Sequence, residues 1–193
     1  MNKKIIGVSG ANGAGKDVLM LFLRDKCNYL FVSATDLLGA ELVKRGLPTD
    51  RKHKAELSAE WRREHGMGVI VQKAYETWQQ QADKYAGVVV GSLRHPGEAD
   101  VVHELGGIVV WLDADAEVRY RRITTNVREG RGSEDQVTFE EFLEHEEREM
   151  HPVGDAATLD MSSVKLRADI FMDNGGEDIA AFEKHAQTVL GIL

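Results

Sequence analysis

The most constraining feature of the sequence is an apolar segment that runs into a glycine loop and then into a helical pattern. Ile5, Ile6 and Val8 predict a short buried strand over residues 3–9, and residues 18–27 are typical of a helix. Between them, residues 10–16 read GANGAGK and fit the spacing G-x-x-x-x-G-K. This order predicts an α/β fold whose ligand lies at the carboxyl end of the first strand.

The glycine loop is suited to binding phosphate. Glycines let successive backbone N–H groups turn inward around an anion, and the helix that starts near Gly15 adds the positive end of its dipole. Lys16 can then reach the β- and γ-phosphates of a nucleotide as a point charge. We therefore predict ATP as the ligand, bound by Gly10, Ala11, Asn12, Gly13, Ala14, Gly15, Lys16, Asp17 and Val18.

The residue after the lysine departs from the usual pattern. A Ser or Thr hydroxyl is expected there to bind Mg²⁺, but the chain has Asp17. A carboxylate is also a hard oxygen ligand, so Asp17 is a candidate Mg²⁺ ligand; the alternative is an acid that the helix dipole favours in the first turn. The third predicted strand ends in Gly91 and Ser92 without the acid that often supports the metal. Asp17 or Asp36 can take over that function, and the sequence leaves both open.

The rest of the chain alternates short apolar runs with helical patterns. We expect further strands at residues 29–33, 87–91, 107–112 and 170–172. Helices are expected over residues 36–85, with breaks near 46–48 and 66–68, and over 116–127, 139–150 and 177–190. Continuous apolar strands between helices are typical of a parallel sheet that is covered on both faces.

These elements predict a single domain over residues 1–193 with a three-layer P-loop NTPase fold and a five-stranded parallel sheet. Its core comprises residues 1–35, 86–115 and 150–193. A helical insertion spans residues 36–85 and is predicted to bind the molecule that accepts a phosphate from ATP, called the acceptor below. A small lid spans residues 116–149.

Composition excludes several classes of partner. The 193 residues carry a net charge of −8, so the chain lacks a globally basic surface for nucleic acid or an anionic membrane. No apolar run approaches the ~20 residues of a membrane span, and the run at residues 5–8 is too short for a signal peptide. We expect a cytoplasmic protein with a small-molecule nucleotide substrate, without nucleic-acid or membrane partners; its oligomeric state stays open.

An arginine cluster lies within thirteen residues of this acidic chain: Arg119, Arg121, Arg122, Arg128 and Arg131. Phosphoryl transfer needs cationic groups around the transferred oxygens, and a closing lid often delivers them. We therefore predict Lys16, Arg119, Arg122, Arg128 and Arg131 as catalytic residues. The alternative is a solvated helix with charge pairs to nearby glutamates. The glutamates over residues 140–149 are interpreted as the solvent face of an amphipathic helix, without a chemical role.

Three further residues are candidates for the acceptor side. Asp36 follows the second strand and is also predicted to be catalytic, because its carboxylate can accept the proton from an attacking hydroxyl or support the metal. A helix cap is an equal interpretation, and the two roles can coexist. Arg94 follows the third strand and can bind an acceptor phosphate; a surface charge is the alternative. Arg62 lies in the helical insertion and can also face the acceptor.

Nearly the whole chain resembles nucleotide-kinase-like P-loop families: nucleoside monophosphate kinases, dephospho-coenzyme A kinase and an archaeal-type group of uncharacterised kinase-like proteins. The loop GxxGxGKD, residues 33–38, residues 91–94 and residues 115–123 carry this resemblance. The resemblance implies adenine contacts from Asn174 and Gly175, with ATP and Mg²⁺ as cofactors. It implies a kinase that acts on a nucleotide or nucleotide-like molecule. A dephospho-coenzyme A kinase, or a nucleotide-binding ATPase or switch without an acceptor, is the alternative.

The first prediction concerns the loop lysine. Lys16→Ala removes the charge that is expected to bind the β- and γ-phosphates, so it should lose both ATP affinity and ATP turnover. Calorimetric titration with ATP and an assay of ADP production measure the two quantities. Full retention of both by the variant would contradict a nucleotide-binding role for the loop.

Overall fold

The computed structural model describes residues 4–125, 137–151 and 154–192, and within them one parallel sheet has the strand order β2-β3-β1-β4-β5. The strands are β1 (Ile5–Gly10), β2 (Tyr29–Ser33), β3 (Gly87–Gly91), β4 (Ile108–Asp113) and β5 (Ile170–Asp173). β1 lies in the middle, between β3 and β4. The glycine loop therefore starts at the centre of the sheet's carboxyl edge, as the predicted five-stranded parallel fold requires.

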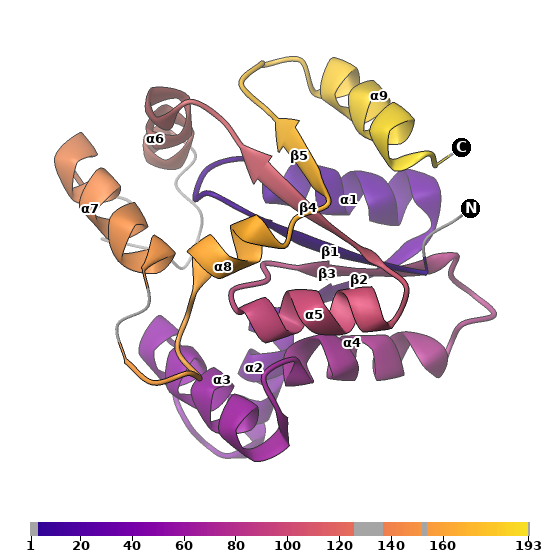
Figure 1. Cartoon of the computed structure of the whole chain (residues 1–193), viewed down its shortest axis with the longest axis vertical. Coiled ribbons are helices and arrows are strands. Elements are labelled where there is room, and N and C mark those ends of the chain that lie inside the picture. The colour runs from indigo at the N-terminus through magenta and orange to yellow at the C-terminus, as the bar shows by residue number, and fades with distance from the viewer. Residues whose placement is uncertain (1–3, 126–136, 152–153, 193) are drawn as a thin grey trace.

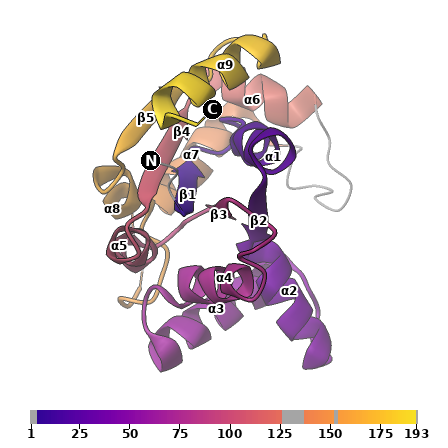
Figure 2. The same ribbon diagram turned by 90° about the vertical axis from the view of Figure 1, so that its right-hand side faces the viewer.

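Helices cover both faces of the sheet because its strands are apolar on both sides (Figures 1 and 2). In β3, Val89 packs toward α1 (Lys16–Cys27) and α9 (Ile179–Leu190). Its neighbours Val88 and Val90 pack toward α4 (Val69–Gln79), α5 (Pro96–Glu104) and α8 (Met161–Leu166). The apolar runs in the sequence thus reflect two buried faces, and each fully buried side chain contributes about 1.5–3 kcal/mol.

The remaining helices gather toward the carboxyl edge of the sheet. α2 (Ala34–Lys44) and α3 (Arg51–His65) pack with α4 around a separate small core that contains Leu42 and Trp61. α6 (Ala116–Thr125) and α7 (Phe139–Met150) pack together through the rings of Tyr120, Phe139 and Phe142. In Figure 1 they lie on the left, near the arrowheads of β4 and β5.

The expected strands are all present within one or two residues of their predicted bounds, but two helices were missed. α5 is nine residues long, and its polar start resembled a loop. Pro96 at its first turn, preceded by the capping residue His95, is a start signal that was available in the sequence. α8 has only six residues, too few to show a helical period. No helix of the described ranges is both long and apolar enough to cross a membrane.

A buried ion pair fastens α3 to the segment that follows β3. Arg62 donates to a carboxylate oxygen of Glu98 at 2.8 Å, and both side chains are only 2% exposed. The other oxygen of Glu98 accepts from the backbone N–H of Arg94 at 2.7 Å. Arg62 also donates to the carbonyl of Ala157 at 3.2 Å. Arg62 is therefore part of the scaffold, where its charge is matched by a single carboxylate.

We expect Arg62→Met to lower the free energy of unfolding by about 3–5 kcal/mol, because it leaves the Glu98 charge buried without its partner. Arg63→Met is the matched control, since Arg63 pairs with Asp155 in an exposed contact and should cost less than about 1 kcal/mol. Urea unfolding followed by circular dichroism measures both values. Equal losses in the two variants would contradict the assignment.

Candidate functional site

The glycine loop has a backbone that only glycine adopts easily. Gly13 and Gly15 have φ angles of 79° and 86°, in the left-handed region. A Cβ on Gly13 would lie 2.6 Å from the carbonyl oxygen of Arg119, and one on Gly15 would lie 2.3 Å from the Asn174 amide nitrogen. The loop is therefore packed closely against Arg119 and Asn174. α1 begins directly after Gly15, and its first residues line the cleft described below.

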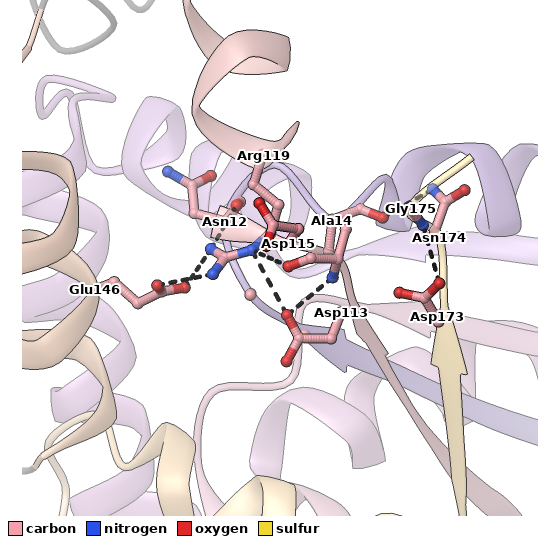
Figure 3. Close-up of polar contacts among 12 residues, drawn as sticks. Asn12, Ala14, Asp113, Asp115, Arg119, Glu146, Asp173, Asn174 and Gly175 are labelled. Atoms are coloured by element: carbon pink, nitrogen blue, oxygen red, sulfur yellow. Dashed lines mark hydrogen bonds and ion pairs between the residues drawn. The ribbon is translucent and has the colours of Figure 1, made fainter. Parts of the chain in front are cut away.

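Arg119 supports the loop from behind, as Figure 3 shows. Its guanidinium donates to the carbonyl of Ala114 at 2.7 Å and to that of Asn12 in the loop at 3.3 Å. The same group forms an ion pair with Glu146 of α7, with its Nη2 3.0 Å from a carboxylate oxygen. Arg119 is 6% exposed and does not line the cleft described below. The predicted catalytic residue therefore acts in this structure as a support of the loop.

Asn174 supports the loop from a third element. Its side-chain amide donates to the carbonyl of Ala14 at 2.9 Å, and its backbone N–H donates to the carbonyl of Asp113 at 2.8 Å. Asn174 also lines the cleft, whereas Gly175 does not appear among the lining residues. The residue after β5 thus holds the loop in place. The adenine contact that the resemblance implies for Asn174 stays a prediction.

A cleft of about 480 Å³ opens beside the loop. Its floor is formed by Gly13, Gly15, Lys16 and Asp17. Its far wall comes from the end of α6 and the segment that joins β5 to α9. The residues of that wall are Arg121, Arg122, Ile123, Thr125, Asn174, Gly176, Glu177, Asp178, Ile179 and Phe182. The far wall therefore combines charged and polar side chains with the apolar Ile123, Ile179 and Phe182, and the loop adds the charges of Lys16 and Asp17.

Two arginines of the predicted cluster line this cleft. Arg122 donates to the carbonyls of Asn174 at 2.7 Å and Gly176 at 2.6 Å. Arg121, which we had not selected, pairs with Glu177 at 3.0 Å on the exposed rim. Arg128 and Arg131 lie outside the described residues. The three described arginines of the cluster thus divide between support of the loop, by Arg119, and the wall of the cleft, by Arg121 and Arg122.

A smaller cleft of about 20 Å³ also has Lys16 in its lining. It is lined by Ser9, Gly10, Asn12, Lys16, Ser92, Leu93, Arg94, Glu149 and Met161. The ammonium group of Lys16 donates to the carbonyls of Gly10 and Ala11, each at 2.8 Å. Ser92 has a φ of 64°, a strained conformation that is often found at functional sites. Asn12, Lys16, Ser92 and Arg94 line both clefts.

The interpretation of α7 as a helix with only a solvent-facing acidic side was wrong for two glutamates. Glu146 and Glu149 have side chains only 21% and 22% exposed, and both pair with arginines. They are three residues apart and so share one face of the helix. Sequence reasoning missed them because the neighbouring glutamates mask this inner face. The spacing of Phe139, Phe142, Glu146 and Glu149 was the available signal.

Glu149 is surrounded by cations. It pairs with Arg94 at 3.1 Å and also with Arg51 at the start of α3. Burial by itself raises the pKa of the Glu149 carboxyl, but the charges of Arg94, Arg51 and Lys16 outweigh it and lower the pKa below its usual value. Glu149 is therefore held as a carboxylate beside the glycine loop.

Two predicted acceptor residues lie outside both clefts. Asp36 is exposed in the first turn of α2, and its backbone N–H donates to the capping hydroxyl of Ser33 at 3.2 Å. Arg62 is committed to Glu98. Arg94, by contrast, lines both clefts. The geometry therefore brings Lys16, Asp17, Arg122 and Arg94 together and leaves Asp36 and Arg62 apart.

Asp17 is the predicted ligand for a divalent cation beside the loop. Asp17 lines the larger cleft in the first turn of α1, next to Lys16. Within the described residues, no three or more His, Cys, Asp or Glu side chains form a ready metal site. Mg²⁺ commonly uses one or two carboxylates and takes its other ligands from substrate phosphates and water, so Asp17 is compatible with it.

The fold and the glycine loop place the chain in the class of P-loop kinase-like α/β proteins. Its structure resembles shikimate kinase from Bacteroides thetaiotaomicron, with a TM-score of 0.56 and 16% identity over 97% of this chain and 98% of that one. It also resembles a gluconokinase from Sinorhizobium meliloti, with a TM-score of 0.54 and 16% identity over 98% and 93% of the two chains. At these identities the likeness establishes the fold alone.

In sequence the chain is similar to archaeal UPF0200 proteins, a name that states no activity. The relative from Pyrobaculum aerophilum is 26% identical over 189 residues, which cover 96% of each chain. The relative from Methanothermobacter thermautotrophicus is 27% identical over 152 residues, or 78% of this chain and 74% of the relative. No protein-family model matches the sequence.

We expect Glu146→Gln to lower the free energy of unfolding by roughly 1–2 kcal/mol, because the nearly buried Arg119 loses its closer carboxylate and keeps only that of Asp113, at 3.5 Å. Glu144→Gln on the same helix is the matched control, since its pair with Arg148 is exposed and should contribute less than about 1 kcal/mol. Urea unfolding compares them. A loss no greater than that of the control would show that Arg119 does not depend on α7.

Proposed function

We propose that this protein is an ATP-dependent phosphotransferase that phosphorylates a nucleotide or nucleotide-like small molecule. The observation that carries the proposal is that Lys16 and Arg94 line both clefts. One cleft has the size and wall of a nucleotide site, and the other begins where the third strand ends. A P-loop lysine between two such spaces suits transfer of a terminal phosphate from one to the other.

On the donor side, the nucleotide phosphates would bind at the loop and the N-terminus of α1. Lys16, which now donates to two loop carbonyls, would exchange these bonds for the β- and γ-phosphates. Arg122 is fixed by the carbonyls of Asn174 and Gly176 and would border the nucleotide at the wall of the cleft. Arg128 and Arg131 remain predicted catalytic residues of the lid region.

On the acceptor side, Arg94 would bind the acceptor, because its side chain lines both clefts and its backbone is fixed by Glu98. Rigid placement of such a group orients the attacking oxygen, which accounts for much of the rate of phosphoryl transfer. Asp36 and Arg62 are not included, since the first is exposed away from the clefts and the second holds the scaffold. The helical insertion would supply the outer wall.

Asp17 would hold Mg²⁺ at the phosphates, directly or through water. When bound, the cation neutralises the charge that develops on the transferred group. The chain contributes the position of this carboxylate, one residue after the lysine and in the first turn of α1. The absence of an acid at Gly91 and Ser92 makes Asp17 the preferred candidate.

A second function is favoured by one observation. Gly91 and Ser92 at the end of β3 carry no carboxylate to support a metal, and Asp36 lies outside both clefts, so neither cleft gains an acid from these positions. A nucleotide-binding ATPase or switch, which has no acceptor, would need none there.

The two functions differ in how ATP consumption responds to acceptors. Purified protein with ATP and Mg²⁺ would be assayed for ADP against nucleoside monophosphates, dephospho-coenzyme A and the matching nucleosides without phosphate. We expect one phosphate-bearing acceptor to raise ADP production and to yield a phosphorylated product by mass spectrometry. Lys16→Ala is the control for contaminating activity. ATP consumption that no acceptor alters would favour the ATPase and contradict the kinase.

A further inference from the structure

The three residues Arg51, Arg94 and Glu149 form a compact charged cluster at the small cleft. They come from α3, from the segment after β3 and from the last turn of α7. Both guanidinium groups contact the same carboxylate oxygen of Glu149. Lys16 adds its charge from the glycine loop and also lowers the pKa of Glu149. One internal carboxylate thus meets cations from three parts of the fold.

Arg94 is held in place independently of Glu149. Its backbone N–H donates to Glu98 at 2.7 Å, and its carbonyl accepts from the N–H of Asp160 at 2.9 Å. Glu98 is in turn held by the buried Arg62. The Arg94 side chain is 36% exposed and reaches into both clefts. Its position is therefore set by the scaffold, while Glu149 is one possible occupant of the space before it.

We propose that Arg51 and Arg94 form a subsite for an anionic group of the acceptor, and that Glu149 occupies this subsite as an internal competitor. The inference rests on the proposed function and narrows its substrate class to acceptors that carry a phosphate or carboxylate. Binding of the acceptor displaces the Glu149 carboxylate from the two arginines. The measured affinity for the acceptor is then the intrinsic affinity of the open subsite multiplied by the fraction of protein in which the subsite is open.

The chemistry of the cluster favours an oxyanion ligand over a metal. Guanidinium groups match the oxygens of phosphate and carboxylate in geometry and charge, and they repel a cation. With both arginines on Glu149, a divalent ion at the same carboxylate would face two positive charges. A phosphate carries more charge and more acceptor oxygens than a single carboxylate, so it can replace Glu149 at both arginines.

The test uses inorganic phosphate as the probe in protein that is first saturated with Mg²⁺ and a non-hydrolysable ATP analogue. The analogue fills the glycine loop, so the added phosphate reports on the second site. We expect Glu149→Gln to bind phosphate at least about fivefold more tightly than the unmodified protein in calorimetric titration, because the competing charge is gone. Glu147→Gln, an exposed neighbour on the same helix, should leave phosphate affinity unchanged.

A further variant locates the binding site. Arg51 is 63% exposed, so Arg51→Gln is expected to fold, and in the Glu149→Gln background it should reverse the gain in phosphate affinity. Circular dichroism and thermal unfolding check that each variant is folded. If Glu149→Gln were unfolded, Arg51→Gln alone should still weaken phosphate binding. Unchanged or weaker phosphate binding by folded Glu149→Gln would overturn the proposal, as would weaker binding of the Mg²⁺-analogue complex, which would make Glu149 a metal residue.

Failure of the proposed function has a separate signature. If the ATP analogue does not bind, the assignment of the larger cleft as the nucleotide site is wrong, regardless of the result of the phosphate titration. The phosphate titration is then repeated without nucleotide in Lys16→Ala, in which the loop lysine no longer attracts the probe. The Glu149→Gln gain and its reversal by Arg51→Gln are expected there too. Their absence would reject the Arg51–Arg94 subsite independently of ATP.

Discussion

The backbone of the glycine loop is the constraint on which the rest of the site depends. Its φ angles at Gly13 and Gly15 require glycine, and both residues pack against neighbouring elements without room for a side chain. The loop carbonyls are taken up by Arg119 at Asn12, by Asn174 at Ala14 and by Lys16 at Gly10 and Ala11. Cationic and amide donors on these carbonyls stabilise the turn that presents the helix N-terminus to an anion.

α7 connects the two sides of the site. Glu146 reaches Arg119 behind the loop, and Glu149, one turn later on the same face, reaches Arg94 and Arg51 at the small cleft. The helix is thereby fixed by ion pairs at both positions, while its outer glutamates form exposed pairs such as Glu144 with Arg148. Within this one helix, Glu146 thus supports the loop, Glu149 contacts the small cleft, and Glu144 faces solvent.

Most of the fold could be predicted from the sequence because its strands are apolar on both faces and its loop motif occurs directly after the first of them. The roles of the charged residues were harder to predict. Arg62 and Arg94 look alike in sequence, yet one is buried against Glu98 and the other lines the clefts. Glu149 lies among exposed glutamates and differs from them only by packing. Such differences arise from tertiary contacts, which no local pattern records.

The shared use of Glu98 limits how the molecule can open and close. One carboxylate oxygen binds Arg62 of α3 and the other binds the backbone after β3, in a place that is almost free of solvent. A hinge movement between α3 and the sheet would separate Arg62 from Glu98 and leave a buried charge without its partner, at a cost of several kcal/mol. This shared carboxylate therefore resists movement of α3 relative to the segment that follows β3.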